Sequence, residues 1–337
     1  MAELVLGVGS SHGPMLNTPP ERWGDRAEAD RRNTNLIFEG REYDFETLLA
    51  ERGGPEAFAD RLGEEVWRDQ HARCQRALDE LHRRIADVAP DVAIIVSSDH
   101  KEIFQDELLP SLAVYWGDSV EHVPFTEEQR AAMAPGLAIA SLGDTPEVQT
   151  TRPCHSGLAK HLIASALDDG FDVAASQQLP AGRHDNHGIP HGWGFIYRQV
   201  MKDDVIPNVP VFVNTFYPPN QPLPSRCYSF GESLRRAVES WDQDLKVAVI
   251  ASGGLSHFVI DEDLDRKVLQ AMEVGDRATL SALPPEQLRS GSSEIRNWIT
   301  VAGAVADADL KMDLVDYVPC YRSEAGTGNA MGFVSWS

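Results

Sequence analysis

Four polar side chains follow short apolar runs or open a helix, and together they could bind a metal. His12 follows VLGVGSS, His100 follows DVAIIVSSD, His257 follows VAVIASGGLS, and Glu294 lies in SGSSEIRNWI. Side chains that follow neighbouring strands can converge over one edge of a sheet. Two histidines and one carboxylate would form a facial triad with open coordination positions, which suits a non-haem Fe(II) oxygenase and leaves the third histidine free for proton transfer.

Each of these residues also has an ordinary structural interpretation. His12 alone is typical of a loop, and His100 after Asp99 can belong to an N-cap and turn. Glu294 lies in a first helical turn, where the helix dipole favours any carboxylate by ~0.3–1 kcal/mol. His257 could be a hydrogen-bonded turn residue. The metal interpretation therefore depends on all four residues occurring together at element ends.

A glycine-rich loop, GRHDNHGIPHGWG, holds three more histidines, His184, His187 and His191. Loops of this composition carry function more often than packing. The three could form a zinc or nickel site by local spacing, but we favour the iron site over it. The four cysteines are far apart and form no CxxC pair, so we expect free thiols rather than a zinc knuckle or disulfides at Cys74, Cys154, Cys227 and Cys320.

Composition and charge narrow the class of protein. The chain has 337 residues, of which 42% are hydrophobic, enough for one large core. No apolar stretch approaches the ~18 residues of a membrane span, and the N-terminus lacks a basic signal region, so we expect a cytoplasmic protein. The formal net charge of -22 disfavours nucleic acid and anionic membranes as partners.

The order of elements predicts an α/β fold. Strands are expected near residues 4–8, 91–97, 111–117, 171–176, 210–219 and 246–252, and helices over 156–168, 229–241, 263–274 and 293–306. The run at 91–97 does not alternate, which fits burial on both sheet faces. We predict a single domain over 1–337, with a mainly parallel or mixed central sheet flanked by helices. A charged, helix-prone segment at about 17–89 reads as a helical insertion after the first strand.

Several stretches resemble one family in order and spacing. They are SSHGP (10–14), PDVAIIVSSDH (90–100), HLIASALDDGFDVAASQQ (161–178), DNHG (185–188), PVFVNTFYPP (210–219), RCYSFGESLRRAVES (226–240), GGLSH (253–257) and EIRNW (294–298). The pattern resembles the class III extradiol ring-cleavage dioxygenases, the group of the protocatechuate 4,5-dioxygenase beta subunit. Residues 17–89 look more like the longer single-chain members that act on gallate or 3-O-methylgallate.

The resemblance implies roles for individual residues. The Fe(2+) ligands would be His12, His100 and Glu294. His257 would be the base that takes a proton from the substrate hydroxyl, and His187 a second acid/base. The sequence departs from the family pattern at Gly192, where a proline is usual, so His184 and His191 stay open as alternatives to His187.

Further residues would support this centre. Asp99 is expected behind His100, either as acceptor of a ring N–H or as cap of a turn. The stretch GTGNAMGF lies where the family contacts the substrate carboxylate, which makes Thr327 and Asn329 candidates.

The implied reaction inserts both atoms of O2 into a catecholic aromatic acid and opens its ring. The implied partners are a small aromatic substrate, O2 and, in a homo-oligomer, further copies of the chain. The insertion would close over the site or form a subunit contact. Two other functions remain open, a metal-binding interaction protein without catalysis and a zinc hydrolase on the same scaffold.

Overall fold

The structure is a computed structural model that describes residues 1–133 and 137–337. Within this part of the chain a mixed sheet of nine strands has the order β11-β13-β1-β10-β4-β9-β5-β8, with β12 paired to β13. Strands β1, β10, β4 and β9 are mutually parallel, whereas β13 runs antiparallel to β1 and β5 runs antiparallel to β9. The strands are β1 (Glu3–Ser10), β4 (Val92–Ser97), β5 (Leu112–Tyr115), β8 (Ala174–Ser176), β9 (Asn208–Val213), β10 (Lys246–Ser252), β11 (His257–Val259), β12 (Met312–Tyr321) and β13 (Thr327–Trp336).

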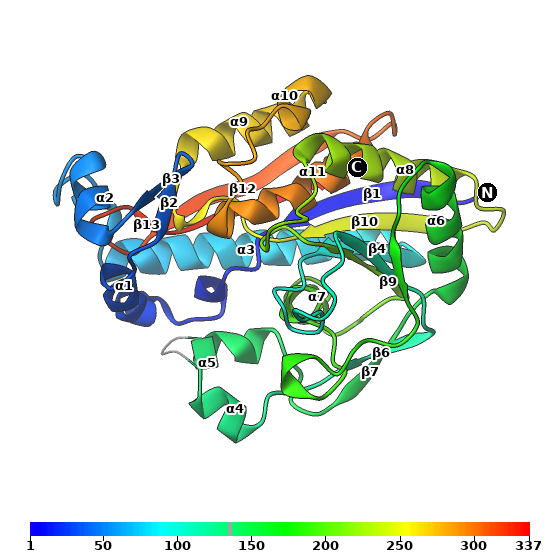
Figure 1. Ribbon diagram of the computed structural model, residues 1–337, viewed down its shortest axis with the longest axis horizontal. Helices are drawn as coiled ribbons and strands as arrows, with labels where there is room; N and C mark the ends of the chain where they lie inside the picture. Colours follow the sequence, from blue (N-terminus) through cyan, green and yellow to red (C-terminus); the bar gives the residue numbers. More distant parts are fainter. Residues whose placement is uncertain (134–136) are drawn as a thin grey trace.

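Helices cover both faces of this sheet, as Figure 1 shows. Alternate residues of β4 enter two different cores, because Ile94 packs with one set of helices and Ile95 with the other. The first face carries α6 (Ser156–Asp168), α8 (Pro224–Glu239), α9 (Glu262–Glu273), α10 (Arg277–Ser281) and α11 (Ile295–Val305). The second face carries α3 (Glu64–Val88) and α7 (His191–Phe195). The prediction of an α/β fold with a mixed, helix-flanked sheet is confirmed.

Two glycines let α8 and α11 approach each other closely. A Cβ atom on Gly231 would lie 1.9 Å from the carbonyl oxygen of Thr300, and one on Gly303 would lie 2.1 Å from that of Tyr228. Both obstacles are backbone atoms, which cannot rotate away. Since α11 begins directly after Glu294, this packing also fixes the position of that carboxylate.

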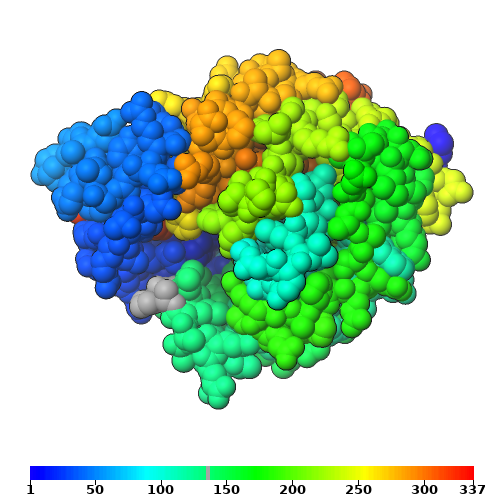
Figure 2. All heavy atoms as spheres, in the orientation of Figure 1, coloured from blue at the N-terminus to red at the C-terminus, as the bar shows by residue number. Residues whose placement is uncertain are grey.

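The segment predicted as a helical insertion is mostly helical but also contains a hairpin. It holds α1 (Trp23–Arg31), α2 (Phe45–Glu51) and α3, and between α1 and α2 the strands β2 (Leu36–Phe38) and β3 (Arg41–Tyr43) pair around Glu39 and Gly40, both with positive φ. The buried face of α3 includes Leu78 and Leu81. Figure 2 shows the N-terminal segment, in blue, against residues near 290, in orange, where Arg289 pairs with Glu42.

The C-terminal hairpin of β12 and β13 was not predicted from the sequence. Every residue of β13 is buried, and the strand pairs with β11, β12 and β1. A smaller antiparallel pair, β6 (Ser119–His122) and β7 (Thr150–Pro153), and the short helices α4 (Glu127–Ala131) and α5 (Leu137–Ala140) also went unpredicted. Over the described residues, the structure contains no helix with the length and apolar character needed to span a bilayer.

Strand β6 supports helix α7 through a buried histidine. His122 Nε2 donates to the carbonyl oxygen of Asp144 at 2.8 Å. Gly194 of α7 packs on the same two groups, since a Cβ there would lie 2.1 Å from that oxygen and 2.9 Å from Nε2. Burial lowers the pKa of His122 from 6.5 to about 4, so the ring is neutral in the folded protein near pH 7.

Replacing Gly303 with alanine should destabilise the protein by about 1–3 kcal/mol, because the added methyl group forces α8 and α11 apart. Gly157→Ala in α6 is the matched control, because its Cβ would meet nothing closer than 3.6 Å. Thermal and urea unfolding of both variants check this. Equal stabilities would contradict the close helix contact.

The contribution of His122 to stability should fall as the pH drops below about 6.5. The unfolded chain takes up a proton on His122 near pH 6.5, whereas the folded protein does so only near pH 4, so the contribution is complete above 6.5 and is lost towards 4. At pH 5 the loss should be about 2 kcal/mol for this group. Urea unfolding at pH 5 and pH 7.5 measures it. His122→Gln should show a smaller difference between the two pH values than the wild type, and an unchanged difference would contradict the assignment.

Candidate active site

Three neighbouring parallel strands deliver the histidines to one edge of the sheet. His12 follows β1, His100 follows β4, and His257 follows β10 as the first residue of β11. Strands β1, β10 and β4 are adjacent and parallel, so their carboxyl ends meet at the same edge. Glu294 ends the 3₁₀ turn Ser290–Glu294 that leads into α11. The structure therefore brings these four sequence-predicted residues together.

Glu294 is the centre of this cluster. Its Oε1 lies 3.0 Å from His12 Nε2 and 2.6 Å from His100 Nε2, and its Oε2 lies 3.6 Å from His257 Nε2. The Gly254 N–H also donates to Oε2, at 2.6 Å. Glu294 is only 1% exposed, and its side chain makes no capping hydrogen bond to α11, so its surroundings are those of a site residue rather than of a helix cap. Burial acts to raise the pKa of Glu294, but His12 and His100 outweigh it and hold that pKa well below its usual value.

The hydrogen bonds of His12 leave one ring nitrogen available as a ligand. Ser252 Oγ donates its proton to the Gly192 carbonyl oxygen at 2.6 Å, so in its contact with His12 Nδ1, at 2.9 Å, it must accept. A neutral His12 ring therefore carries its proton on Nδ1 and presents the Nε2 lone pair to Glu294 Oε1. Two acceptors 3.0 Å apart repel unless a proton or a metal cation lies between them. Glu294, His12 and His100 thus form a donor set suited to a cation.

His257 is held as a neutral base. Its Nδ1 lies 2.8 Å from the Leu255 carbonyl oxygen, which can only accept, so the proton is on Nδ1 and Nε2 carries a lone pair. Burial lowers the pKa of His257, which further favours the neutral ring. Nε2 is the atom that faces Glu294, and the side chain keeps 13% of its surface exposed.

His191, the first residue of α7, is the member of the glycine-rich loop that reaches the cluster. Its ring centroid lies 4.9 Å from that of His12 and 5.4 Å from that of His100. Ring nitrogens of these three histidines lie within 4.8 Å of one another, a second possible metal-binding group within the described residues. Gly192 makes the approach possible, because a Cβ there would lie 2.2 Å from Ser97 Oγ and 3.2 Å from His12 Cε1.

A buried carboxylate raises the pKa of His191, whereas burial lowers the pKa of His257. The Nδ1–H of His191 donates to Glu102 Oε1, and its backbone N–H donates to Oε2 at 3.1 Å. Burial alone would lower the pKa of His191, but Glu102 outweighs it and raises that pKa to about 9. The ring is therefore a cation at neutral pH, with an Nε2–H left to donate. Nothing in the sequence marks Glu102 as a candidate site residue except its position two residues after His100.

The other two histidines of the loop lie outside the cluster. His187 is exposed, has a positive φ, and donates from Nδ1 to the Leu179 carbonyl oxygen at 2.8 Å. The ring of His184 makes a T-shaped contact with Phe125, and its Nε2 accepts a hydrogen bond from Arg183 Nε at 3.0 Å. The structure thus separates the three histidines that their local spacing would have placed in one metal site.

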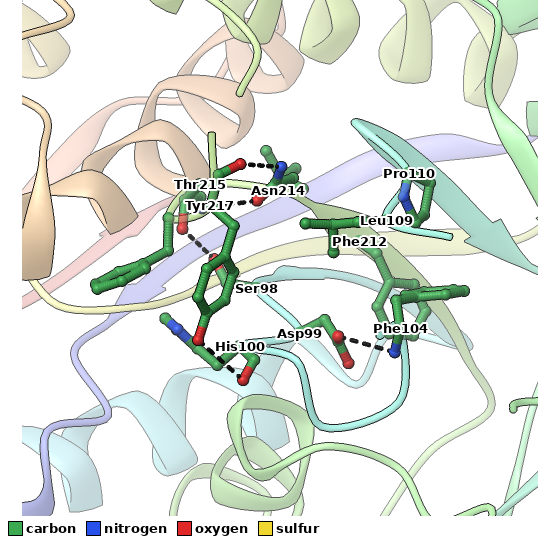
Figure 3. A pocket seen from close by; sticks show the side chains of 12 residues that line it. Ser98, Asp99, His100, Phe104, Leu109, Pro110, Phe212, Asn214, Thr215 and Tyr217 are labelled. Atoms are coloured by element: carbon green, nitrogen blue, oxygen red, sulfur yellow. Dashed lines mark hydrogen bonds between the residues drawn. The ribbon is translucent and has the colours of Figure 1, made fainter. Parts of the chain in front are cut away.

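Asp99 supports the loop after His100 rather than the ring itself. Its two carboxylate oxygens accept the backbone N–H groups of Ile103 and Phe104, each at 3.0 Å. Figure 3 shows the bond to Phe104. Burial raises the pKa of Asp99 to about 6. The figure also shows the Tyr217 hydroxyl directed at the His100 carbonyl oxygen, 3.4 Å away. These bonds fix the turn in which His100 adopts a φ of 51°.

Of the two predicted carboxylate contacts, only Asn329 borders the cluster. It pairs with His257 across β13 and β11, and its Nδ2 lies 2.9 Å from the position of a Cβ on Gly13. Thr327 is fully buried, and its hydroxyl donates to Asp30 Oδ2 at 2.5 Å.

Comparison with known proteins identifies the family of this chain. The sequence profile of the family described as the catalytic LigB subunit of aromatic ring-opening dioxygenase matches residues 64–328. The match includes α3, which the sequence had suggested lies in an insertion, and it includes His100, His191, His257 and Glu294. His12 lies before it.

Individual relatives are similar at low identity. A 2,3-dihydroxyphenylpropionate/2,3-dihydroxicinnamic acid 1,2-dioxygenase of Rhodococcus sp is 28% identical over 54% of this chain and 48% of its own length. A gallate dioxygenase of Pseudomonas putida is 28% identical over 45% of this chain and 46% of its own length. A 2,3-dihydroxyphenylpropionate/2,3-dihydroxicinnamic acid 1,2-dioxygenase of Comamonas testosteroni is 24% identical over 72% of this chain and 66% of its own length. The chain spans about half the length of the first two relatives.

One solved structure, an uncharacterized protein JW3007 from Escherichia coli K12, aligns over 98% of the chain with a TM-score of 0.48 and 14% identity. The family assignment rests on the profile, which covers most of the sequence. The chain belongs to the family of the catalytic LigB subunit of aromatic ring-opening dioxygenases.

Proposed function

We propose that this protein is an Fe(II)-dependent extradiol dioxygenase that inserts both atoms of O2 into a catecholic aromatic acid and opens its ring. The observation that carries the proposal is the convergence of His12 Nε2 and His100 Nε2 on one oxygen of Glu294, at 3.0 and 2.6 Å. Family membership and the names of the relatives, a gallate dioxygenase among them, support the same reaction class.

The ligands proposed for the iron are His12, His100 and Glu294. His191 is the alternative third ligand, but its Nδ1–H is committed to Glu102 and the pair favours the charged ring, which has no lone pair to offer. Ferrous iron held by two imidazoles and one carboxylate would supply a redox-active centre with open positions for a diol and for dioxygen.

The protein's own residues would move the protons. A phenol has a pKa near 10, so binding a catechol as its anion near neutral pH needs a base. His257 Nε2, with its lone pair facing Glu294, would take that proton. His191 Nε2–H would return a proton to the oxygen that leaves when the ring opens. Environments that push the pKa values of two histidines apart are the expected basis of such a division between base and acid.

Oxygen uptake by anaerobically purified, Fe(II)-loaded protein tests the proposal. Protocatechuate, gallate, 3-O-methylgallate and catechol form the panel, with product absorbance followed in parallel. We expect stoichiometric uptake and a yellow ring-opened product with at least one of them. Glu294→Gln should abolish iron retention and uptake together, and an active, iron-loaded variant would refute the ligand assignment.

Two other outcomes would identify the alternatives. Tightly bound zinc with hydrolysis and without oxygen uptake would indicate a hydrolase. Bound metal without turnover of any catechol would favour a metal-binding interaction protein.

His191→Gln should lower kcat by about 10²–10⁴-fold and leave substrate binding nearly unchanged, because glutamine cannot supply the proton. His187→Gln should retain activity within about twofold, since the His187 side chain is exposed and hydrogen-bonded within its own loop. Steady-state kinetics on the best substrate compare the two variants. A loss confined to the His187 variant would transfer the acid role to His187.

A further inference from the structure

A fully buried carboxylate attaches the loop that carries His257 to helix α9. Asp265 of α9 is 0% exposed. Its Oδ1 accepts the backbone N–H of Ser256 at 2.8 Å, and its Oδ2 accepts the hydroxyl of Ser256 at 2.6 Å. Ser256 directly precedes His257 in the chain. The carboxylate therefore holds the backbone one residue away from the proposed base.

Other elements complete the hold on Ser256. Its hydroxyl oxygen accepts the backbone N–H of Asp261 at 2.8 Å, and its carbonyl oxygen accepts the N–H of Ala330 in β13 at 2.9 Å. The Tyr317 hydroxyl, from β12, donates to Asp265 Oδ2 at 2.8 Å. Every polar group of Ser256 is thus hydrogen-bonded, and Asp265 and Ser256 together join α9 to β12 and β13.

The ring of His257 is fixed to the same loop. Its Nδ1–H donates to the carbonyl oxygen of Leu255, on the other side of Ser256, at 2.8 Å. A Cβ on Gly254 would lie 2.5 Å from Nδ1, so the ring packs directly on the loop backbone. In this position Nε2 lies 3.6 Å from Glu294 Oε2. Because the ring is bonded to the loop, a shift of Ser256 would also shift Nε2 relative to Glu294.

The surroundings of Asp265 give it no compensating positive charge. Its three hydrogen-bond donors are neutral groups, and burial raises its pKa to about 7. An apolar side chain would avoid this desolvation cost. The hydrogen bonds survive protonation of the carboxylate, because the hydroxyls of Ser256 and Tyr317 can accept as well as donate. What Asp265 contributes is therefore the position of its oxygens between α9 and the loop, and not its charge.

We propose that Asp265 is a positioning residue, which acts through Ser256 to hold His257 Nε2 where it can take the proton of the substrate hydroxyl. This role rests on the proposed function, in which His257 is the base. A misplacement of about 1 Å can lower a catalytic rate by about 100-fold. A phenol has a pKa near 10, so the need for a well-placed base decreases as the pH rises towards that value.

Oxygen-uptake kinetics of the Fe(II)-loaded enzyme between pH 7 and pH 9 test the proposal. Asp265→Ala should lower kcat/KM about 10- to 100-fold at pH 7, and this loss should become severalfold smaller at pH 9. Asp265→Asn should retain activity within about threefold, because its amide oxygen still accepts the Ser256 N–H and its amide N–H groups can donate to the two hydroxyls. Asp261→Asn is the matched control. It removes a carboxylate at the start of α9 but keeps the helix cap, so it should behave as the wild type.

A double-mutant cycle separates positioning from a general loss of stability. In a His257→Gln background, Asp265→Ala should lower kcat/KM by less than about threefold further, because the base that it positions is absent. An equal loss in both backgrounds, or a loss that does not change with pH, would overturn the positioning role. If Asp265→Ala does not fold, Ser256→Ala replaces it, since it removes only the hydroxyl bond, and a pH profile identical to that of the wild type would overturn the role.

The tautomer of His257 gives a readout that does not depend on the reaction. Nitrogen-15 NMR of histidine-labelled, metal-free protein, with the signals of His257 assigned from His257→Gln, should show the proton on Nδ1 in the wild type. Asp265→Ala should show a mixture of tautomers, because the loop no longer holds Nδ1 against the Leu255 carbonyl oxygen. This difference, in a wild type that takes up no oxygen, would refute the dioxygenase and retain the positioning role. The same single tautomer in both proteins would refute the role of Asp265.

Discussion

Glu294 carries a negative charge that the fold withdraws from water, and the protein must balance that charge internally. An unpaired buried carboxylate costs several kcal/mol, so every group around it is constrained. Gly254 donates its N–H to one oxygen, and His12 and His100 converge on the other. The close packing of α8 against α11 then holds the carboxylate at the edge of the sheet, because α11 starts at the next residue.

The pKa of each of two histidines in the cluster depends on the group that accepts the hydrogen bond from its Nδ1–H. A backbone carbonyl behind His257 fixes its tautomer without adding charge, and burial then keeps the ring neutral. A carboxylate behind His191 compensates burial and keeps the ring charged. Two histidines of one cluster therefore differ in charge because the groups that accept their Nδ1–H hydrogen bonds differ. Asp99, by contrast, acts on backbone N–H groups and stabilises a turn.

Elements with a clear local pattern of apolar residues could be predicted from the sequence. Elements and contacts that depend on residues far away in the chain could not. The apolar runs of β1, β4 and β10, with a histidine after each, predicted that these histidines would converge at one edge of the sheet, as they do. His191, and not His187, lies in the cluster, and its partner there is Glu102, which lies 89 positions earlier in the chain; no local pattern contains that information. Strand β13 was missed because its glycines and polar residues weaken the strand signal, while its burial comes from pairing with three other strands. The buried ion pair between Asp30 and Arg322 spans 292 positions and was equally invisible.

The strand order also has a consequence for synthesis on the ribosome. Strand β1 has β10 and β13 as its neighbours, and β10 separates it from β4. The first strand to emerge therefore stays unpaired until residue 246 and those after it have been made. During that time β1 and β4 are exposed edges of apolar sequence, which are prone to mispair with other chains. During synthesis, α3 and the other helices can form early, because their contacts are local. The sheet is complete only after β10 has paired between β1 and β4 and β13 has paired beside β1.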